Sequence, residues 1–189
     1  RPNGAFIAAP NPNYSFLWIR DHLYMAFAYW YLGPEYFDKL IQSVQLVFNI
    51  FHTHRHKLER VLPPRDHTGK LIIYELINAK YDPTTLSEVT HQWGHHQLDM
   101  IGLFLYIIAD LDYKKLTVIR DRKDREILQL LIFYLQNVHY WEEPDNGIWE
   151  DCLIRHSSSI GSVVAGLRYI QKQGLLVSAV PDQLISLGE

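Results

Sequence analysis

Three clusters in this chain combine acids and aromatic rings just before apolar stretches, and the first two also contain a cation. The first is the segment 11–21, which ends in Trp18-Ile-Arg20-Asp21. A carboxylate beside a guanidinium can accept and donate hydrogen bonds to neighbouring hydroxyls of one sugar, while an indole packs on the apolar face of the ring. Asp21 could equally cap a helix with Arg20 as its ionic partner, and these residues alone leave both interpretations open.

The second cluster is Lys80-Tyr81 followed by Trp93-Gly-His-His-Gln97-Leu-Asp99. It brings an aromatic ring, an amide and an acid within two turns of a predicted helix start. The same pattern fits a buried helix start whose polar groups are satisfied within the protein.

The third cluster is Asn146-Gly-Ile-Trp149-Glu150-Asp151. An acid next to a tryptophan can be partly desolvated, which raises its pKa and suits it to donate a proton near neutral pH. A second Trp-Glu dipeptide occurs just upstream at Trp141-Glu142, so the dipeptide alone does not identify an acid.

Apolar periodicity predicts an all-α scaffold of antiparallel helix pairs that hold these clusters. Spacings of three and four residues predict helices over 21–32, 35–57, 93–111, 127–138 and 157–174, and a further short helix after Pro181. Residues 63–83 contain Pro-Pro and His-Thr-Gly and are predicted to be mainly loop. One of the serines at 157–159 is expected to cap the helix that follows.

Composition and charge exclude several classes of function. The 189 residues carry a net charge of −3 with acids and bases interspersed. The sequence therefore lacks the clustered basic residues that are typical of nucleic-acid binding. Charges break every apolar run before it is long enough to cross a bilayer, so no membrane partner is expected. The single cysteine excludes an internal disulfide. Histidines at 52, 54, 56, 91 and 95 lack a well-placed third ligand, so no metal is predicted.

Taken in order, the clusters resemble the catalytic domain of glycoside hydrolase family 15, the glucoamylase family. The set is Tyr14…Trp18-x-Arg20-Asp21, Lys80-Tyr81, Trp93-Gly-x-x-Gln97-x-Asp99 and Gly147-Ile-Trp149-Glu150. It resembles even more closely the N-terminal domain of the phosphorylase kinase α and β subunits. The resemblance runs from about residue 3 to residue 174. It implies that residues 1–189 form the first half of a single (α/α)₆ toroid.

This resemblance implies two groups of site residues. Arg20 and Asp21 would hold the terminal glucose, and Tyr14 and Trp18 would line that subsite.

The other group would surround the scissile bond. Lys80 and Trp93 would contact the substrate there, and Glu150 would be the general acid. Trp149 and Asp151 would flank the bound sugar. Asp151 stands where the fungal enzymes have a second Glu.

The implied activity is hydrolysis of terminal α-linked glucose from an α-glucan or oligosaccharide, with inversion and without a cofactor. In the family the general base comes from the C-terminal half of the domain, so this chain alone is predicted to be inactive. The alternative is a phosphorylase-kinase-like regulatory or glucan-binding domain without turnover, and calmodulin would be a partner only in that case. A helical interaction scaffold is a third possibility, which leaves the ordered polar clusters unexplained.

Overall fold

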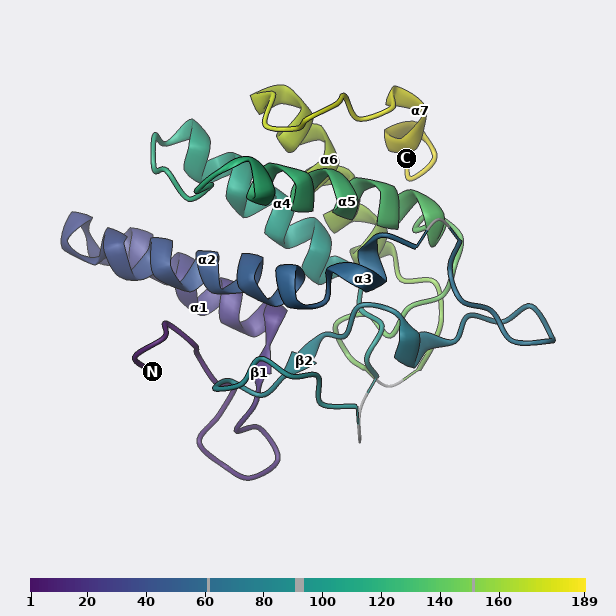
Figure 1. Ribbon diagram of the computed structural model, residues 1–189, viewed down its shortest axis with the longest axis horizontal. Helices are drawn as coiled ribbons and strands as arrows, with labels where there is room; N and C mark the ends of the chain where they lie inside the picture. The colour runs from purple at the N-terminus through teal and green to yellow at the C-terminus, as the bar shows by residue number, and fades with distance from the viewer. Residues whose placement is uncertain (61, 91–93, 151) are drawn as a thin grey trace.

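Helices make up the body of the structure, and the long connections gather beside the short strands at one end (Figure 1). This computed structural model describes residues 1–60, 62–90, 94–150 and 152–189. Within them the elements are β1 (Leu17–Trp18), α1 (Ile19–Leu32), the 3₁₀ turn η1 (Pro34–Tyr36), α2 (Phe37–Thr53), α3 (Arg55–Leu58), η2 (Ile73–Glu75), β2 (Lys80–Tyr81), α4 (Asp99–Tyr113), α5 (Arg122–Asn137), α6 (Ser157–Gln173) and α7 (Asp182–Ser186).

Helices α4 and α6 lie against each other and run in the same direction. At their starts the Ser162 hydroxyl donates to the Asp99 carbonyl (2.9 Å), and further along the rings of Tyr106 and Tyr169 meet at 5.1 Å. Between these contacts two glycines face each other. A Cβ on Gly102 would lie 2.4 Å from the backbone of Ser162, and a Cβ on Gly166 would lie 2.4 Å from the Gly102 carbonyl oxygen. The helix backbones therefore approach more closely than any side chain at these positions would allow.

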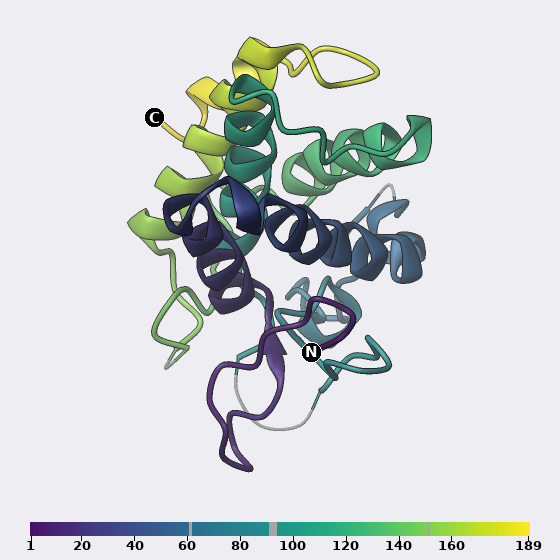
Figure 2. The same cartoon turned by 90° about the vertical axis from the view of Figure 1, so that its left-hand side faces the viewer.

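Helix α1 packs on the other side of α4, so that α6, α4 and α1 form a row of helices. Arg20 at the start of α1 bonds Asp99 at the start of α4, and Lys114 at the end of α4 lies over the ring of Phe27, 4.9 Å from its centroid. The two helices thus run in the same direction. The loops that lead into α1, α4 and α6 consequently meet at one end of the row, below the helices in Figure 2.

A second row, formed by α2 with α3 and by α5, packs behind the first. His22 of α1 bonds the backbone carbonyl of Ser43 in α2 (2.8 Å), and His52 at the end of α2 bonds Asp124 of α5 (2.9 Å). Asp121 caps α5 by accepting hydrogen bonds from the backbone amides of residues 123 and 124.

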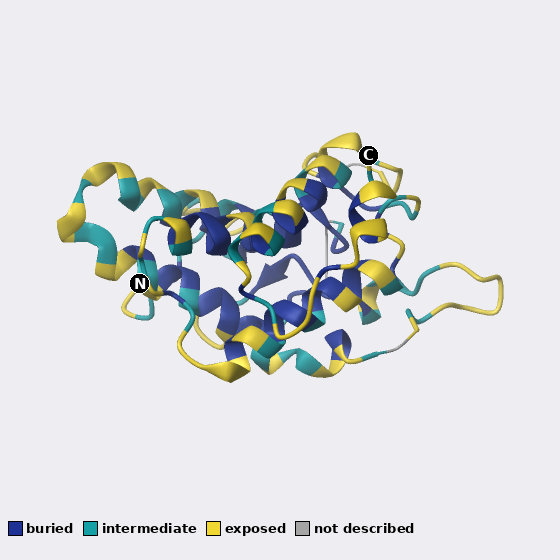
Figure 3. Cartoon of the chain, turned by 90° about the horizontal axis from the view of Figure 1, so that it is seen from above, coloured by how far each residue is buried: buried dark blue, intermediate teal, exposed yellow. Residues whose placement is uncertain are grey.

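Apolar side chains between the two rows form the core. Phe48 and Phe51 of α2 both meet Phe104 of α4 edge to face, and all three are fully buried. Buried positions lie on the inward sides of the helices and on the short strands (Figure 3). Among the described helices, none has both the length and the apolar character needed to span a bilayer.

The predicted helices are present, but several of their boundaries were wrong. The helix expected over 35–57 is a 3₁₀ turn followed by α2, which ends at a break at His54 before the short α3. Helix α5 begins at Arg122 rather than 127, and α1 begins at Ile19 rather than 21. The predicted serine cap of α6 was also wrong, because His156 occupies the N-cap and makes no side-chain cap bond.

The largest error concerns the helix expected from residue 93. Residue 93 lies outside the described residues, and residues 94–98 are not helical, so α4 begins at Asp99. The physical reason is that this segment bonds another loop. The His96 amide donates to the Asn146 side chain (3.2 Å), the His96 carbonyl accepts from the Asn146 amide (2.7 Å), and the Leu98 amide donates to Asp145 (2.9 Å).

Candidate active site

The candidate site lies where the loops before α1, α4 and α6 meet. The short sheet fixes its first wall. β1 and β2 pair antiparallel with Trp18 opposite Lys80, so these two side chains share one face. The Lys80 ammonium lies 4.7 Å from the centroid of the Trp18 ring and 4.3 Å from that of Phe16. The Tyr14 ring follows at 5.9 Å from Trp18. Aromatic faces therefore surround a buried cation.

Lys80 is only 1% exposed, and its ammonium nitrogen makes no hydrogen bond to a described residue. Burial lowers the pKa of Lys80, and the nearby charge of Glu150 acts in the opposite direction. The ammonium thus retains N–H donors that an oxygen-rich ligand could use.

A tight turn before α6 presents Glu150 to the site. The Glu150 amide donates to the Asn146 carbonyl (3.1 Å), and both Gly147 and Glu150 have left-handed backbone angles, with φ of 56° and 61°. Glycine adopts this conformation readily, whereas a glutamate in it is uncommon and is held by its surroundings. The two hydrogen bonds between Asn146 and His96 described above hold this turn in place.

The Glu150 carboxyl is largely buried and hydrogen-bonded. Its Oε1 accepts from Nε2 of Gln97 (2.7 Å) and from Nη2 of Arg20 (3.3 Å), and its side chain is 13% exposed. Burial raises the pKa of Glu150 above its ordinary value. The bonds from Gln97 and Arg20 oppose that rise, and the negative charge of Asp21 adds to it. A carboxyl with a raised pKa is suited to act as a proton donor.

Arg20 directs its guanidinium into the protein. Nη1 donates to Gln97 Oε1 and to Asp99 Oδ2, both at 2.9 Å, and Nη2 donates to the Ile148 carbonyl and to Glu150, both at 3.3 Å. Its side chain is 9% exposed. Arg20 therefore ties the loops before α4 and α6 to the start of α1, a role that the sequence interpretation did not include.

The structure brings most of the predicted site residues together. Trp18 and Lys80 are buried, Asp21 is half-buried in the first turn of α1, and Tyr14 is 40% exposed beside Trp18. Trp149 is next to Glu150 in the chain and is 77% exposed.

Two of the predicted substrate contacts, Trp93 and Asp151, lie outside the described residues. Conversely, Gln97, Asp99 and Phe16 contact site residues, although no site role was predicted for them. Gln97 and Asp99 belong to the ordered motif, and that membership was the available signal. Nothing in the pattern marked Phe16 apart from its place between Tyr14 and Trp18.

Histidines that raised the question of a metal bind protein groups instead. His52 bonds Asp124, His54 bonds the carbonyl of Leu86, and His95 bonds that of Thr90. His91 lies outside the described residues. Among the residues that the structure describes, no cluster of three or more ligating side chains is present.

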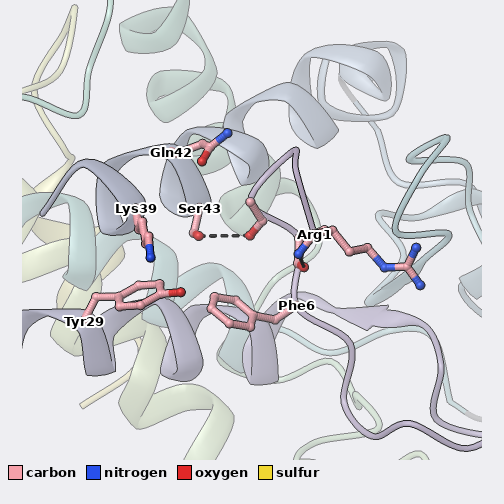
Figure 4. A pocket seen from close by; sticks show the side chains of 8 residues that line it. Arg1, Phe6, Tyr29, Lys39, Gln42 and Ser43 are labelled. Atoms are coloured by element: carbon pink, nitrogen blue, oxygen red, sulfur yellow. Dashed lines mark hydrogen bonds between the residues drawn. The ribbon is translucent and has the colours of Figure 1, made fainter. Parts of the chain in front are cut away.

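A separate hollow of about 210 Å³ lies between the N-terminal segment and helices α1 and α2 (Figure 4). The rings of Phe6 and Tyr29 form one side, with their centroids 5.7 Å apart, and the Ser43 hydroxyl bonds the Gly4 carbonyl across it (2.9 Å). The described residues that line this hollow include no carboxylate, and none of them belongs to the site around Glu150.

Comparison with known proteins identifies the family. The model of glycosyl hydrolases family 15 matches residues 1–172 of this chain. The chain belongs to glycosyl hydrolase family 15. This family-15 chain is also similar to the "Probable phosphorylase b kinase regulatory subunit alpha" of Caenorhabditis elegans, with 27% identity over 88% of the chain. The liver isoform of that subunit from Takifugu rubripes is 30% identical over 70% of the chain. The chain spans only 16% and 12% of the lengths of these relatives.

Solved structures identify the fold of the family-15 chain. A wild-type glycosidase matches all of it with a TM-score of 0.77 at 19% identity, and a variant of a glycosidase in complex with glucose matches equally well. The glucoamylase of Saccharomycopsis fibuligera matches 98% of the chain with a TM-score of 0.58 at 18% identity. The chain covers 50% of each glycosidase and 39% of the glucoamylase. The expected fold class is therefore confirmed: the helices are those of a six-hairpin glycosidase toroid, of which the chain matches one half.

Proposed function

We propose that this chain carries the acid half of an inverting exo-acting α-glucosidase site, which removes terminal α-linked glucose from α-glucans or oligosaccharides. The observation that carries this proposal is the Glu150 carboxyl. It is largely buried, its pKa is raised, and it stands in a site that also contains a buried cation and aromatic rings. Burial favours the protonated form of such a carboxyl, which can pass its proton to a leaving oxygen.

The other residues would bind the sugar. Asp21 would accept hydrogen bonds from its hydroxyls, Trp18 and Tyr14 would pack on its ring, and Lys80 would donate to an oxygen near the scissile bond. Arg20 already donates four hydrogen bonds to protein groups, so its remaining donor for the proposed sugar contact is Nε–H.

Three further contacts come from the resemblance alone. The exposed Trp149 ring would flank the sugar, and Trp93 and Asp151 would complete the site around the scissile bond. No cofactor is required for this chemistry, because proton transfer and attack by water are sufficient.

The general base is proposed to lie outside this chain. Inversion requires a second carboxylate about 6.5–9.5 Å from the acid, so that a water molecule fits between them and the sugar. We assign residues 1–189 to a single domain whose other half supplies that carboxylate. Exposed aromatic side chains support this assignment, because α1 leaves Tyr24 and Tyr31 exposed by 60% and 78%, and α4 leaves Tyr106 and Tyr113 exposed by 41% and 62%. The two tyrosines on each helix are seven residues apart and so lie on one face of it, and an apolar face of this kind can be covered by another part of a protein.

The test uses the parent protein, which contains this chain together with the rest of the domain. Maltose or maltotriose should release glucose in the β configuration, observed by proton NMR before mutarotation. Glu150→Gln keeps the size of the side chain but cannot supply the proton, so kcat should fall by roughly 10²–10⁴. A glucosyl fluoride needs little acid assistance and should partly restore the rate.

The matched control is Glu142→Gln, in the second Trp-Glu dipeptide. The Glu142 side chain is 57% exposed and bonds His139, away from the candidate site. This substitution should leave kcat nearly unchanged. Full activity of Glu150→Gln would contradict the acid assignment.

A second candidate function is a regulatory, glucan-binding domain without turnover. It is favoured by the likeness to subunits that are named as regulatory subunits of phosphorylase b kinase. In that case the same site would bind maltose and release no glucose, and calmodulin would be a partner of the whole protein. Calorimetry with maltose, combined with an assay for released glucose, separates the two functions, because binding without release supports only the second.

A further inference from the structure

The orientation of the Gln97 carboxamide is fixed by three hydrogen bonds around it. Its Nε2 donates to the Gly94 carbonyl (3.0 Å) and to Glu150 Oε1 (2.7 Å), and its Oε1 accepts from Arg20 Nη1 (2.9 Å). Exchanging the amide oxygen and nitrogen would place oxygen against two acceptors and NH₂ against a guanidinium donor. Only one orientation therefore satisfies all the partners.

This orientation distinguishes the two oxygens of the Glu150 carboxyl. Oε1 accepts from both Gln97 and Arg20, so a proton on Oε1 would compete with two donors. Among the described residues, Oε2 has no hydrogen-bond partner. A proton on the neutral carboxyl is therefore carried more favourably by Oε2.

We propose that Gln97 is the positioning residue of the Glu150 carboxyl: it fixes Oε1 as an acceptor and leaves Oε2 to carry the proton that reaches the leaving oxygen. The delivery of that proton rests on the proposed function, whereas the arrangement of the carboxyl does not. In the step itself, the Oε2–H bond breaks, the proton passes to the glycosidic oxygen as its bond to the sugar carbon breaks, and Glu150 becomes a carboxylate. Gln97 and Arg20 then hydrogen-bond the charge left on it.

Gln97 connects otherwise separate elements around this carboxyl. Among the described residues, the charged groups that act on Glu150 include Arg20 and Asp21 from the start of α1 and Lys80 from β2. Arg20 also pairs with Asp99 at the start of α4 (2.9 Å). Gln97 is uncharged, so it can hold Oε1 at 2.7 Å without adding a further ion pair to those that Arg20 makes with Asp99 and Glu150. A lysine or arginine there would favour the carboxylate more strongly and weaken the acid.

The test is a carbon-13 NMR titration of the Glu150 carboxyl in this chain, with Glu150→Gln to assign the signal. Gln97→Met keeps an unbranched side chain of similar length and removes the donor to Oε1. Loss of that donor disfavours the carboxylate, so the pKa of Glu150 should rise by about one unit. Gln97→Glu keeps the shape and places a second carboxyl beside the first. The Glu150 signal should then titrate over a broader range that extends to higher pH, because the two groups are coupled.

Gln45→Met is the matched control. Gln45 also donates one side-chain hydrogen bond, to the Val118 carbonyl (3.0 Å), but it lies on α2 and has no contact with Glu150. It should leave the Glu150 titration unchanged. If Gln97 serves only to hold the loop, both Gln97 variants will lower the melting temperature and leave the Glu150 midpoint in place, and that result overturns the proposal. Shifted midpoints in this chain, together with a parent protein that binds maltose and releases no glucose, would support the role of Gln97 and refute the hydrolase function.

Discussion

Acid should destabilise this fold through a histidine that is buried in its neutral form. His22 of α1 is fully buried, accepts a hydrogen bond from the Phe6 amide at Nδ1 (3.2 Å), and bonds the Ser43 carbonyl at Nε2 (2.8 Å). A protonated ring would lose the first bond and carry an uncompensated charge in the core. Burial accordingly lowers the pKa of His22 from 6.5 to about 4.

The size and sign of the effect follow from proton binding. Between pH 6.5 and about pH 4 the unfolded chain binds a proton at His22 and the folded chain does not, so stability falls as the pH falls through this window. The pKa difference of about 2.5 units corresponds to about 3 kcal/mol of unfolding free energy. His96, whose pKa burial also lowers to about 4, acts in the same direction.

Urea unfolding of the unmodified chain and of the His22→Gln variant, near neutral pH and at about pH 4.5, measures this contribution. Glutamine keeps a donor and an acceptor but does not titrate. The variant should be the less stable protein near neutral pH, and its disadvantage should shrink by about 2–3 kcal/mol at the lower pH. Carboxylates titrate in both proteins and cancel in the comparison. His139→Gln, which removes an exposed histidine, is the control. If the unfolding free energies of His22→Gln and of the unmodified chain change with pH in parallel, the reasoning is refuted.

Three other substitutions test the site and its scaffold. Asp21→Ala should weaken maltose binding at least tenfold in calorimetry while the unfolding free energy falls by only about 1 kcal/mol or less, because Asp21 contributes one acid to the first turn of α1; normal binding with a large drop in melting temperature would refute the sugar contact. Lys57→Met should lower the urea-unfolding free energy by about 3–5 kcal/mol, because the buried Lys57 ammonium bonds both oxygens of Glu88, and an effect below 1 kcal/mol would show that the pair is dispensable. Gly102→Ala should cost about 1–3 kcal/mol in thermal melts, since its methyl group would meet the Ser162 backbone at 2.4 Å, and an unchanged melting temperature would mean that α4 and α6 can separate freely.

The spacing of apolar residues was sufficient to predict the helices, because each helix packs at least one apolar face against its neighbours. It failed where backbone groups bond across the fold. Residues 94–98 have a pattern compatible with helix, yet His96 and Leu98 bond the loop around Asn146, about 50 residues away. No property of a short window records such a partner. The N-cap of α6 was misassigned for a related reason, since three consecutive serines gave several equivalent starting points and His156 holds the position.

The candidate site was predictable as a set of residue types and not as a network. Glu150, Lys80 and Trp18 were identified by the order of the motifs, and the structure brings them together. The interpretation of Arg20 as a sugar ligand did not foresee that its guanidinium bonds both Asp99 and Glu150. Those partners lie 79 and 130 residues away, so their identity depends on how α1, α4 and α6 are packed.

The contact between Gly102 and Gly166 has a consequence for comparing chains of this family. Gln97 and Asp99 lie immediately before or at the start of α4, and Glu150 lies shortly before α6, so the spacing of these two helices sets the distance across which the acid is held. A homologue that retains Trp-Glu but has a bulky residue at either glycine position would separate the two loops. Small residues at these two positions are therefore a criterion, independent of the acid itself, for selecting homologues that can assemble the site. Conversely, a lineage that no longer needs the acid can lose this spacing first, while its Trp-Glu dipeptide still remains in the sequence.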